Sequence, residues 1–465
     1  MQIKRSFSPT ASFTAPDKIV TTTDPDFGGT TTLVKRILFS LLFFIAFANA
    51  SAQKAEHVVL ITIDGFRPDF YLEQGWNTPN LRAMMRAGFH AKGVNSVFPS
   101  MTYPSHTTIV TGVRPAKHGI YFNSMFEPNG PTGKIYWMDS SIKVPTLWTA
   151  AKDKGLKTAA MFWPVSADAP VDYNIADVGS MGVKNMAAYA KPAGFYDLVR
   201  KELFNDSPRI DLGKDYNVAN IAAKVIKEGK PNFMTIHFFG VDSKSHQQGR
   251  NGEAVKEAVA VADSSVGIVM QALKDAGIFE KTVFIVTGDH GFTDVTSTVS
   301  PNVWLKEAGI IKDVKTDDWK AQFFSVGGSS YLYLKDKNDQ QTAKQVLDLL
   351  NKLPSEHKKL FRIIDRKKMD GAGANPDVAF AITAENGGSF GNSMTGEAVK
   401  ARTLGGAHGN FPDFKEIRTG FVAIGPGVKA GTSVQLMELR DISPFVVKVL
   451  GLKIDGMEGK VPAGL

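Results

Sequence analysis

Thr102 lies within the segment Phe98-Pro-Ser-Met-Thr-Tyr-Pro-Ser-His-Thr-Thr-Ile-Val-Thr-Gly112, between a strand-like run and the predicted start of a helix. Pro104 suits the first helical turn, because the N–H that it lacks would be unbonded there in any case. A hydroxyl at a helix N-terminus lies at the positive end of the helix dipole, which favours an alkoxide and a bound anion. Threonines in such places most often cap the helix. Thr102 is therefore a candidate nucleophile only if the rest of the chain supplies groups that would ionise it.

The composition is that of an ordinary globular protein. Of the 465 residues, 43% are hydrophobic and 22% are charged, and this length allows one large domain or two smaller ones. The formal net charge is +8, but Lys and Arg are interleaved with Asp and Glu. No arginine-rich block or nucleic-acid-binding module is found. The charge therefore indicates a solvated surface with mild attraction for anionic small molecules, and we expect no stable nucleic-acid complex.

The N-terminal region has the pattern of a secretory signal. Lys35 and Arg36 precede the apolar run Ile37–Phe47, and two small-residue cleavage positions follow at Ala48-Asn-Ala50 and Ala50-Ser-Ala52. The apolar run is too short to cross a bilayer core of about 30 Å. We therefore expect residues 1–52 to be an N-terminal extension and signal peptide. The mature chain, residues 53–465, is then secreted or periplasmic without a membrane span.

Two further features of the sequence concern the start of the chain and the chemistry open to it. The residues before Val34 are polar and rich in Thr, Ser and Pro, so they are either an extension or the result of a misplaced start site with Val34 as the first codon. The chain contains no cysteine, which excludes disulfides, a cysteine nucleophile and thiolate ligands. A transition-metal site would have to use histidines and carboxylates, the set that suits catalytic zinc.

Short apolar runs alternate with helical patterns along the chain. His57–Ile63 is typical of a buried parallel strand, and Asn77–Gly88 has the cap, proline and glycine of a helix. This alternation predicts an α/β fold, a mostly parallel central sheet with helices on both faces. The further strands that we expect are Thr158–Phe162, Phe233–Phe239, Thr282–Thr287 and Gly420–Ile424, and the further helices are Pro145–Lys154, Tyr216–Glu228, Glu253–Ala276 and Ile442–Leu450.

Residues from about 300 to 402 have a different texture. Their pattern predicts a smaller strand–helix–strand unit, inserted in the main domain as a cap subdomain. Its expected elements are Ser329–Leu334, Gln341–Leu353, Phe361–Asp365 and Asp377–Thr383.

Ionisable residues follow several predicted strands. Ligands of open α/β sheets bind at the carboxyl ends of the strands. Asp64 ends the first strand, and Asp289 and His290 follow the run Val283–Val286. Two ionisable groups at a strand end are costly to bury unless they are paired or bind a metal. The other members of this set are Asp242 and His246, after Phe233–Phe239, and His408, in the glycine-rich loop Gly405–Asn410.

Each of these residues also has an ordinary structural interpretation. Asp64 alone would most often cap a helix, and a loop histidine such as His408 is most often merely exposed. Three other histidines serve for comparison. We assign His106 to structure rather than metal binding and His237 to the core in mid-strand, and His118 has no evident partner.

Together, three aspartates and three histidines from four segments suffice for two metal ions that share a nucleophile. Two divalent ions about 4 Å apart can deprotonate a hydroxyl and hold the opposing oxygens of an in-line phosphoryl displacement. Such ligands satisfy zinc at about 2 Å, although they also serve other divalent ions. Thr102 would supply the alkoxide. Asn123 could donate its amide to a phosphoryl oxygen, or it could be a turn asparagine.

The ordered motifs resemble those of the alkaline phosphatase superfamily and, within it, the nucleotide pyrophosphatase/phosphodiesterase family. The resemblance extends from about Val58 to the C-terminus and implies an alkaline-phosphatase-like fold for the catalytic domain. The motifs that carry it are Pro99–Gly112, Asp242–His246, Thr287–Phe292 and Gly406–Gly409.

The resemblance implies two zinc sites. The ligands of one would be Asp242, His246 and His408, and those of the other would be Asp64, Asp289, His290 and the hydroxyl oxygen of Thr102.

The resemblance also implies substrate contacts. Asn123 matches the asparagine of the family that contacts the phosphoryl oxygen. Tyr103 matches an aromatic position of the substrate pocket, where it could stack on a nucleobase, and packing in the core is the alternative. Met161-Phe-Trp-Pro164 is similar to a Phe-Trp-Pro segment of the diesterases, which makes Trp163 a candidate substrate contact or, equally, a core residue.

The sequence departs from the family pattern at two places. Ser245, preceded by Lys244, stands where the family usually has Gly before the metal-binding histidine, and Ser105 stands where it usually has Asn. Neither change removes a ligand, but Lys244 adds a cation near the expected site.

These features predict an exported two-metal phosphodiesterase or nucleotide pyrophosphatase that acts through a phospho-threonine intermediate at Thr102. The alternatives are a phosphomonoesterase or phosphonate hydrolase of the same superfamily, and a metal-binding protein without turnover. A sulfatase is disfavoured because its nucleophile derives from cysteine or serine.

Overall fold

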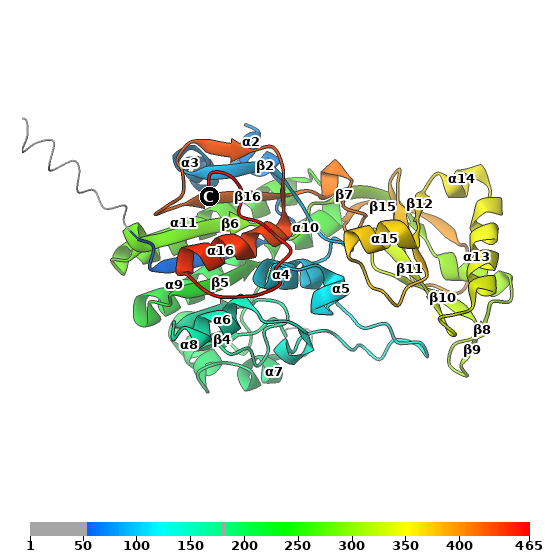
Figure 1. Ribbon diagram of the computed structural model, residues 1–465, viewed down its shortest axis with the longest axis horizontal. Coiled ribbons are helices and arrows are strands. Elements are labelled where there is room, and N and C mark those ends of the chain that lie inside the picture. The colour runs from blue at the N-terminus through cyan, green and yellow to red at the C-terminus, as the bar shows by residue number, and fades with distance from the viewer. Residues whose placement is uncertain (1–53, 179–181) are drawn as a thin grey trace, which may run out of the picture. The chain divides into compact units, whose positions relative to one another are not determined.

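Strand β1 (His57–Ile63) is buried along its whole length and lies in the middle of the main sheet. The structure, a computed structural model shown in Figure 1, describes residues 54–178 and 182–465. β1 pairs in parallel with β5 (Phe233–Phe238) on one side and β6 (Thr282–Thr287) on the other. Its largely apolar sequence follows from this position, because a strand covered on both faces exposes neither row of side chains.

The main sheet is mostly parallel, which confirms the predicted class. Its strand order is β17-β2-β16-β6-β1-β5-β3-β4, with β18 beside β2, and β16 runs antiparallel to both of its neighbours. The remaining strands are β2 (Phe89–Asn95), β3 (Thr158–Met161), β4 (Tyr173–Ile175), β16 (Thr419–Ile424), β17 (Thr432–Val434) and β18 (Met437–Glu438).

Helices cover both faces of this sheet, as predicted. Successive side chains of β1 point in opposite directions, so Ile61 belongs to one hydrophobic core and Leu60 to the other. The helices that pack on the Ile61 face are α3 (Pro79–Ala87), α8 (Phe195–Phe204), α9 (Asp215–Gly229) and α11 (Glu253–Asp275), and those on the Leu60 face are α4 (Thr102–Thr111), α6 (Leu147–Asp153) and α16 (Ile442–Leu450). The other α-helices described between β1 and β6 are α2 (Asp69–Leu72), α5 (Pro115–His118), α7 (Val183–Ala188) and α10 (Gly240–Gln248), and short 3-10 helices lie at Asp139–Ser141 and Phe279–Lys281.

A second, antiparallel sheet forms between α12 and β14, within the segment expected to be inserted. Its order is β10-β11-β13-β12, so the predicted strand–helix–strand unit is part of a four-stranded sheet. Figure 1 labels three of these strands, β10, β11 and β12. The elements of this region are α12 (Pro301–Glu307), β8 (Ile311–Asp313), β9 (Asp318–Trp319), β10 (Ala321–Ser325), β11 (Ser329–Leu334), α13 (Gln340–Lys352), α14 (Ser355–Lys358), β12 (Phe361–Ile364), α15 (Arg366–Ala372) and β13 (Phe380–Ala384).

One predicted strand of this region starts late. We expected a strand from Asp377, whereas β13 begins at Phe380. The guanidinium of Arg366 donates hydrogen bonds to the carbonyl oxygens of Asn375 and Val378. These bonds hold the preceding residues in a turn rather than in the sheet ladder.

A small three-stranded sheet, β14-β7-β15, is formed by β7 (Thr293–Val299), β14 (Gly388–Phe390) and β15 (Val399–Ala407). The predicted signal peptide and N-terminal extension lie outside the described residues. No helix within residues 54–178 and 182–465 combines the length and apolar character needed to cross a membrane. The described residues group together as one unit by their internal contacts.

Candidate active site

Helix α4 begins at Thr102, and its N-cap position is occupied by Met101 without a side-chain cap. Among the described residues, the Thr102 hydroxyl makes no hydrogen bond, so the cap interpretation does not hold. Its side chain is 8% exposed. The imidazole of His106 donates from Nδ1 to the carbonyl oxygen of Thr102 at 2.7 Å, and its Nε2 lies 2.8 Å from the hydroxyl of Thr62 in β1. His106 thus anchors the first turn of α4 to the sheet.

The carboxyl ends of three adjacent strands bring the predicted ionisable residues together. Asp64 directly follows β1, and Asp289 and His290 follow β6. Asp242 and His246 lie in α10, which begins shortly after β5. Because β1 pairs in parallel with both β5 and β6, all three segments end at the same edge of the sheet.

His408 comes to the same edge from another direction. We expected a glycine-rich loop here, but Gly405–Ala407 belong to strand β15, and His408 follows that strand directly. A Cβ atom at Gly406 would lie 2.4 Å from the carbonyl oxygen of Ser245. The glycine therefore allows β15 to approach α10 closely enough for His408 to meet the residues of that helix.

The three histidines are all fixed in the same tautomer. Nδ1 of His246 lies 3.0 Å from the carbonyl oxygen of Gly406. Nδ1 of His290 lies 3.1 Å from the carbonyl oxygen of Gly291, and Nδ1 of His408 lies 3.1 Å from that of Ser100. A carbonyl only accepts, so each Nδ1 must carry the proton and each Nε2 presents a lone pair.

These lone pairs face carboxylate oxygens. Nε2 of His290 lies 3.3 Å from Oδ1 of Asp64 and 3.1 Å from Oδ2 of Asp289. Oδ1 of Asp242 lies 3.3 Å from Nε2 of His246 and 3.6 Å from Nε2 of His408. While the imidazoles are neutral and the carboxyl groups ionised, acceptors therefore meet acceptors at both places. Burial opposes protonation of His246, but its contact with Asp242 raises its pKa above the ordinary value.

Several of these atoms are buried and have no hydrogen-bond partner: Oδ1 of Asp64, Oδ1 of Asp242, Oδ2 of Asp289 and Nε2 of His290. Buried acceptors that face one another without a donor repel, and a cation removes the repulsion. The donor set, carboxylate oxygen and imidazole nitrogen, is one that suits zinc. The residues present therefore fit divalent metal ions.

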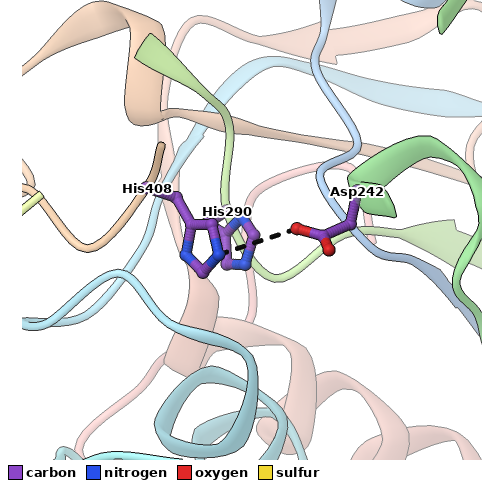
Figure 2. A group of neighbouring side chains, drawn as sticks. All are labelled: Asp242, His290 and His408. Carbon is purple, nitrogen blue, oxygen red and sulfur yellow. Dashed lines mark ion pairs between the residues drawn. The ribbon is translucent and has the colours of Figure 1, made fainter. Parts of the chain in front are cut away.

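The ligand atoms form two groups that share His290. One group is Asp64, Asp289 and His290, the same three side chains that the resemblance implied for one site. The other is Asp242, His290 and His408, in which the ligand atoms lie within 4.8 Å of one another (Figure 2). The rings of His290 and His408 are stacked with centroids 3.6 Å apart. His246, the third ligand expected there, contacts Asp242 but is not part of this group.

Burial and neighbouring charges shift the pKa values of the three carboxyl groups in different directions. Burial raises the pKa of Asp64 well above its ordinary value, and the charges of Asp242 and Asp289 raise it further. Burial likewise raises the pKa of Asp289. Burial opposes ionisation of Asp242 too, but its contacts with His246 and His408 lower its pKa below the ordinary value.

Two of the predicted substrate-contact residues, Tyr103 and Asn123, are joined beside Thr102. The backbone N–H of Tyr103 donates to Oδ1 of Asn123 at 2.9 Å, which leaves the amide hydrogens of Asn123 free of that bond. The hydroxyl of Tyr103 lies 3.2 Å from Oδ2 of Asp177. Sequence reasoning missed Asp177, because β4 has only three residues and no recognisable period. Its one signal was a carboxylate placed two residues after a strand.

Two predicted positions have other roles. Trp163 is fully buried, and its ring packs edge-on against His106 and Trp148. With no exposed surface, Trp163 lies in the core, which is the alternative that the sequence left open for it. His237 is buried in mid-strand as expected, but its Nε2 also lies 3.2 Å from Oδ2 of Asp64. This contact had no signal in the sequence.

The two departures from the family pattern are accommodated. Ser245 is buried where α10 meets β15, and Lys244 is partly exposed beside the histidine that follows it. The hydroxyl of Ser105 lies 3.1 Å from that of Ser96 in the segment after β2. His118 is buried against Thr108 and the backbone N–H of Ile120, a structural environment.

The profile of the type I phosphodiesterase / nucleotide pyrophosphatase family matches residues 58–409. The chain therefore belongs to this family.

Curated relatives are similar over most of the chain. Ectonucleotide pyrophosphatase/phosphodiesterase family member 7 of Mus musculus is 23% identical over 423 residues, which cover 88% of this chain and 87% of the relative. Family member 3 of Bos taurus is 25% identical over 81% of this chain, and the match spans 40% of that longer protein.

A solved structure shares the fold. Murine ectonucleotide pyrophosphatase/phosphodiesterase 5 has 20% identity and a TM-score of 0.65, with 87% of this chain and 97% of that chain covered. An inactive variant of the same murine protein has been solved in complex with AMP.

Proposed function

We propose that the protein is an exported, two-metal phosphodiesterase of the nucleotide pyrophosphatase type, with Thr102 as the nucleophile. The observation that carries the proposal is the acceptor-only arrangement of six side chains at the sheet edge. Four of their ligand atoms are buried and unpartnered, and the start of α4 places an unbonded hydroxyl in the same region. Family membership supports the diesterase and pyrophosphatase class, and the signal pattern in the sequence supports export.

The ligands of one metal ion would be Asp64, Asp289 and His290, and those of the other would be Asp242, His246 and His408, with His290 close to both. When bound, two zinc ions would supply the positive charge that ionises the Thr102 hydroxyl and offsets negative charge on the phosphoryl oxygens.

The reaction at phosphorus uses the hydroxyl of Thr102 and then a water molecule. The Thr102 oxygen attacks phosphorus, and the bond from phosphorus to the leaving group breaks with its electron pair going to that group. This forms a phosphate ester on Thr102 that keeps the second substituent. Water then hydrolyses the ester, which releases a phosphomonoester and restores the hydroxyl. For a nucleotide substrate the product is a nucleoside monophosphate.

Two contacts within the chain orient the groups that take part in these steps. His106 fixes the carbonyl of Thr102, and so holds the first turn of α4 against β1. Asn123 is held by the N–H of Tyr103 through Oδ1, which leaves its N–H groups to donate to a non-bridging phosphoryl oxygen.

The test uses an aryl phosphodiester with a chromogenic leaving group, such as p-nitrophenyl thymidine 5′-monophosphate. We expect Thr102→Ala to lower kcat by at least about 10³-fold, and acid quenching of the wild-type enzyme to trap a nucleotidyl adduct on Thr102. Wild-type turnover by the alanine variant would refute the nucleophile. A higher kcat/KM for p-nitrophenyl phosphate than for the diester would refute the diesterase assignment in favour of a monoesterase.

A further inference from the structure

A cavity of about 410 Å³ lies where helix α15 faces the ends of β2 and β18. Its walls come from both sheets of the protein, because α15 belongs to the segment with the antiparallel sheet and the two strands belong to the main sheet. None of the Asp and His residues of the metal clusters lines it. Its volume is within the range of pockets that hold small molecules, roughly 300–1,000 Å³.

Three side chains that line this cavity carry a positive charge without a counter-charge. Arg114 directly precedes α5, Lys368 lies in α15, and Arg440 lies in the short 3-10 helix η5 (Leu439–Asp441). Within residues 54–178 and 182–465, none of these three side chains forms an ion pair or a hydrogen bond, and Nε of Arg440 is buried without a partner. Like charges around one cavity repel one another, and a bound anion would offset that repulsion.

The two acidic side chains on the cavity wall are already engaged elsewhere. Asp413 forms an ion pair with Arg362. Glu438 accepts a hydrogen bond of 2.9 Å from Nδ2 of Asn95, and it also accepts one from the backbone N–H of Asp441 in a capping box. Neither carboxylate pairs with any of the three cations. The charge that remains available to a ligand is therefore positive.

Both walls of the cavity are fixed by packing. A Cβ atom at Gly373, just after α15, would lie 2.5 Å from Cδ of Arg114, so the arginine stem packs directly on the glycine. The backbone N–H of Ala116 donates to the carbonyl oxygen of Gly373 at 2.8 Å. On the other wall, β18 pairs in parallel with β2. The cations are thus brought together before any ligand binds, which lowers the entropic cost of binding.

We propose that this cavity is a second anion site, which takes a phosphate-type dianion between Arg114, Lys368 and Arg440. Guanidinium groups bind tetrahedral oxyanions through paired N–H donors, and an ammonium adds a compact positive charge. Phe411 is half-buried on the same cavity wall and offers an apolar surface to a small organic substituent. Inorganic phosphate and a phosphomonoester share this chemistry. The site lies outside the proposed catalytic machinery, so it does not depend on that function.

The experiment is a calorimetric titration of the metal-loaded protein with inorganic phosphate and, separately, with phenylphosphonate, which has no ester bond to hydrolyse. The metal clusters would bind these anions too, so we expect two binding events per chain in the wild type. Arg440→Gln and Lys368→Gln should each weaken one event by at least about 10-fold. The other event, and the inhibition of diester hydrolysis by the same anions, should change by less than about 3-fold.

Arg86→Gln is the matched control. Arg86 is exposed on α3, does not line the cavity, and has no ion pair or side-chain hydrogen bond among the described residues. The variant loses the same charge and should keep both binding events. Equal weakening in Arg86→Gln and Arg440→Gln would show an effect of overall charge and overturn the site. Lys368 is exposed on α15, so Lys368→Gln tests the site even if Arg440→Gln does not fold.

The two probes distinguish the possible ligands. If phenylphosphonate binds the cavity at least about 3-fold more tightly than phosphate, the site is one for a phosphomonoester whose organic part lies against Phe411. Equal or tighter binding of phosphate makes it a site for the inorganic ion. After removal of the metal ions, only the cavity event should remain, so failure of the proposed catalysis leaves this test intact. Unchanged binding of both probes in Arg440→Gln and Lys368→Gln would refute the site and leave the proposed function standing.

Discussion

The backbone N–H of Tyr103 donates a hydrogen bond of 2.9 Å to Oδ1 of Asn123. This bond occupies Oδ1, so the N–H groups of the amide remain to donate to another acceptor.

We predict that Asn123→Asp will keep the bond to Tyr103 but lose the donor, and that Asn123→Ala will lose both. Removal of one such donor costs about 10²–10³-fold in kcat. We therefore expect kcat of both variants on an aryl phosphodiester to be lower by this factor. The aspartate variant should be at least as impaired as the alanine variant, because it adds a negative charge. Thermal unfolding of both variants serves as the control. Unchanged kcat in Asn123→Asp would exclude a role for the amide in catalysis.

Removal of the metal ions should destabilise the protein as well as inactivate it. The buried acceptors of Asp64, Asp289 and His290 repel one another without a cation, so bound metal stabilises the folded state. A ligand at 1,000 times its Kd contributes about 4 kcal/mol per site. We expect dialysis against a chelator to abolish activity and lower Tm, and added Zn²⁺ to restore both. Metal analysis should find two ions per chain. A chelated protein with the original Tm would contradict the site.

Gly406 should not tolerate a side chain. A Cβ atom there would lie 2.4 Å from the carbonyl oxygen of Ser245 and 2.8 Å from the ring of Phe292. Gly406→Ala must push β15 away from α10 and separate His408 from Asp242, with an overpacking cost of about 1–3 kcal/mol. We expect lower stability in urea and at least about 10-fold weaker metal binding.

Gly371, in helix α15, is the matched control. A Cβ atom at this position meets no atom within 4 Å, and alanine is favoured over glycine inside a helix by roughly 0.5–1 kcal/mol. Gly371→Ala should therefore retain metal binding and be as stable as the wild type or more so. Equal behaviour of the two variants would show that the close approach at Gly406 does not matter.

His118 should make the fold sensitive to acid. Burial lowers the pKa of this residue to about 3, whereas the unfolded chain titrates near about 6.5. Between these values the unfolded state binds one more proton, so the free energy of unfolding falls as the pH decreases, by about 1.4 kcal/mol per pH unit. The stabilisation is complete above about pH 6.5.

The measurement is urea unfolding of the wild type and His118→Gln at pH 7, 6 and 5, with metal saturation kept equal. We expect the dependence of stability on pH to be shallower in the variant by about one proton. His118 contacts Thr108 and Ile120 rather than the metal clusters, so loss of metal cannot explain the difference. Parallel pH curves for the two proteins would show that His118 titrates normally in the folded state.

Local sequence patterns predicted most of the main elements. The strands His57–Ile63 and Thr282–Thr287 and the helix Ile442–Leu450 have the predicted bounds, because apolar period and end signals are local properties. The short strands β4 and β10 have no such signals, and the pairing of β10 with β11 depends on residues distant in the chain. The turn that delays β13 depends on a guanidinium from α15, which no local pattern around Asp377 encodes.

In the candidate site, too, local patterns predicted some features, whereas others depend on residues distant in the chain. The placement of Asp64, Asp289 and His290 after apolar runs predicted that they lie near one another, since parallel strands end at one edge. The sequence could not tell whether Trp163 faces a ligand or the core, and the structure buries it. Neither Asp177 beside Tyr103 nor His237 beside Asp64 could be predicted, because these contacts join separate strands.

The sequence by itself determined the fold class, the ionisable residues at the strand ends and the threonine at the start of a helix. These depend on periodicity, chain order and residue chemistry. Only the tertiary structure decided that the Nε2 atoms of three histidines point at carboxylate oxygens and that His290 belongs to both clusters. The structure also decided that, within the described residues, Asp177 forms no ion pair with a Lys, Arg or His. Orientation and charge compensation depend on which distant groups are within reach, and packing alone sets that.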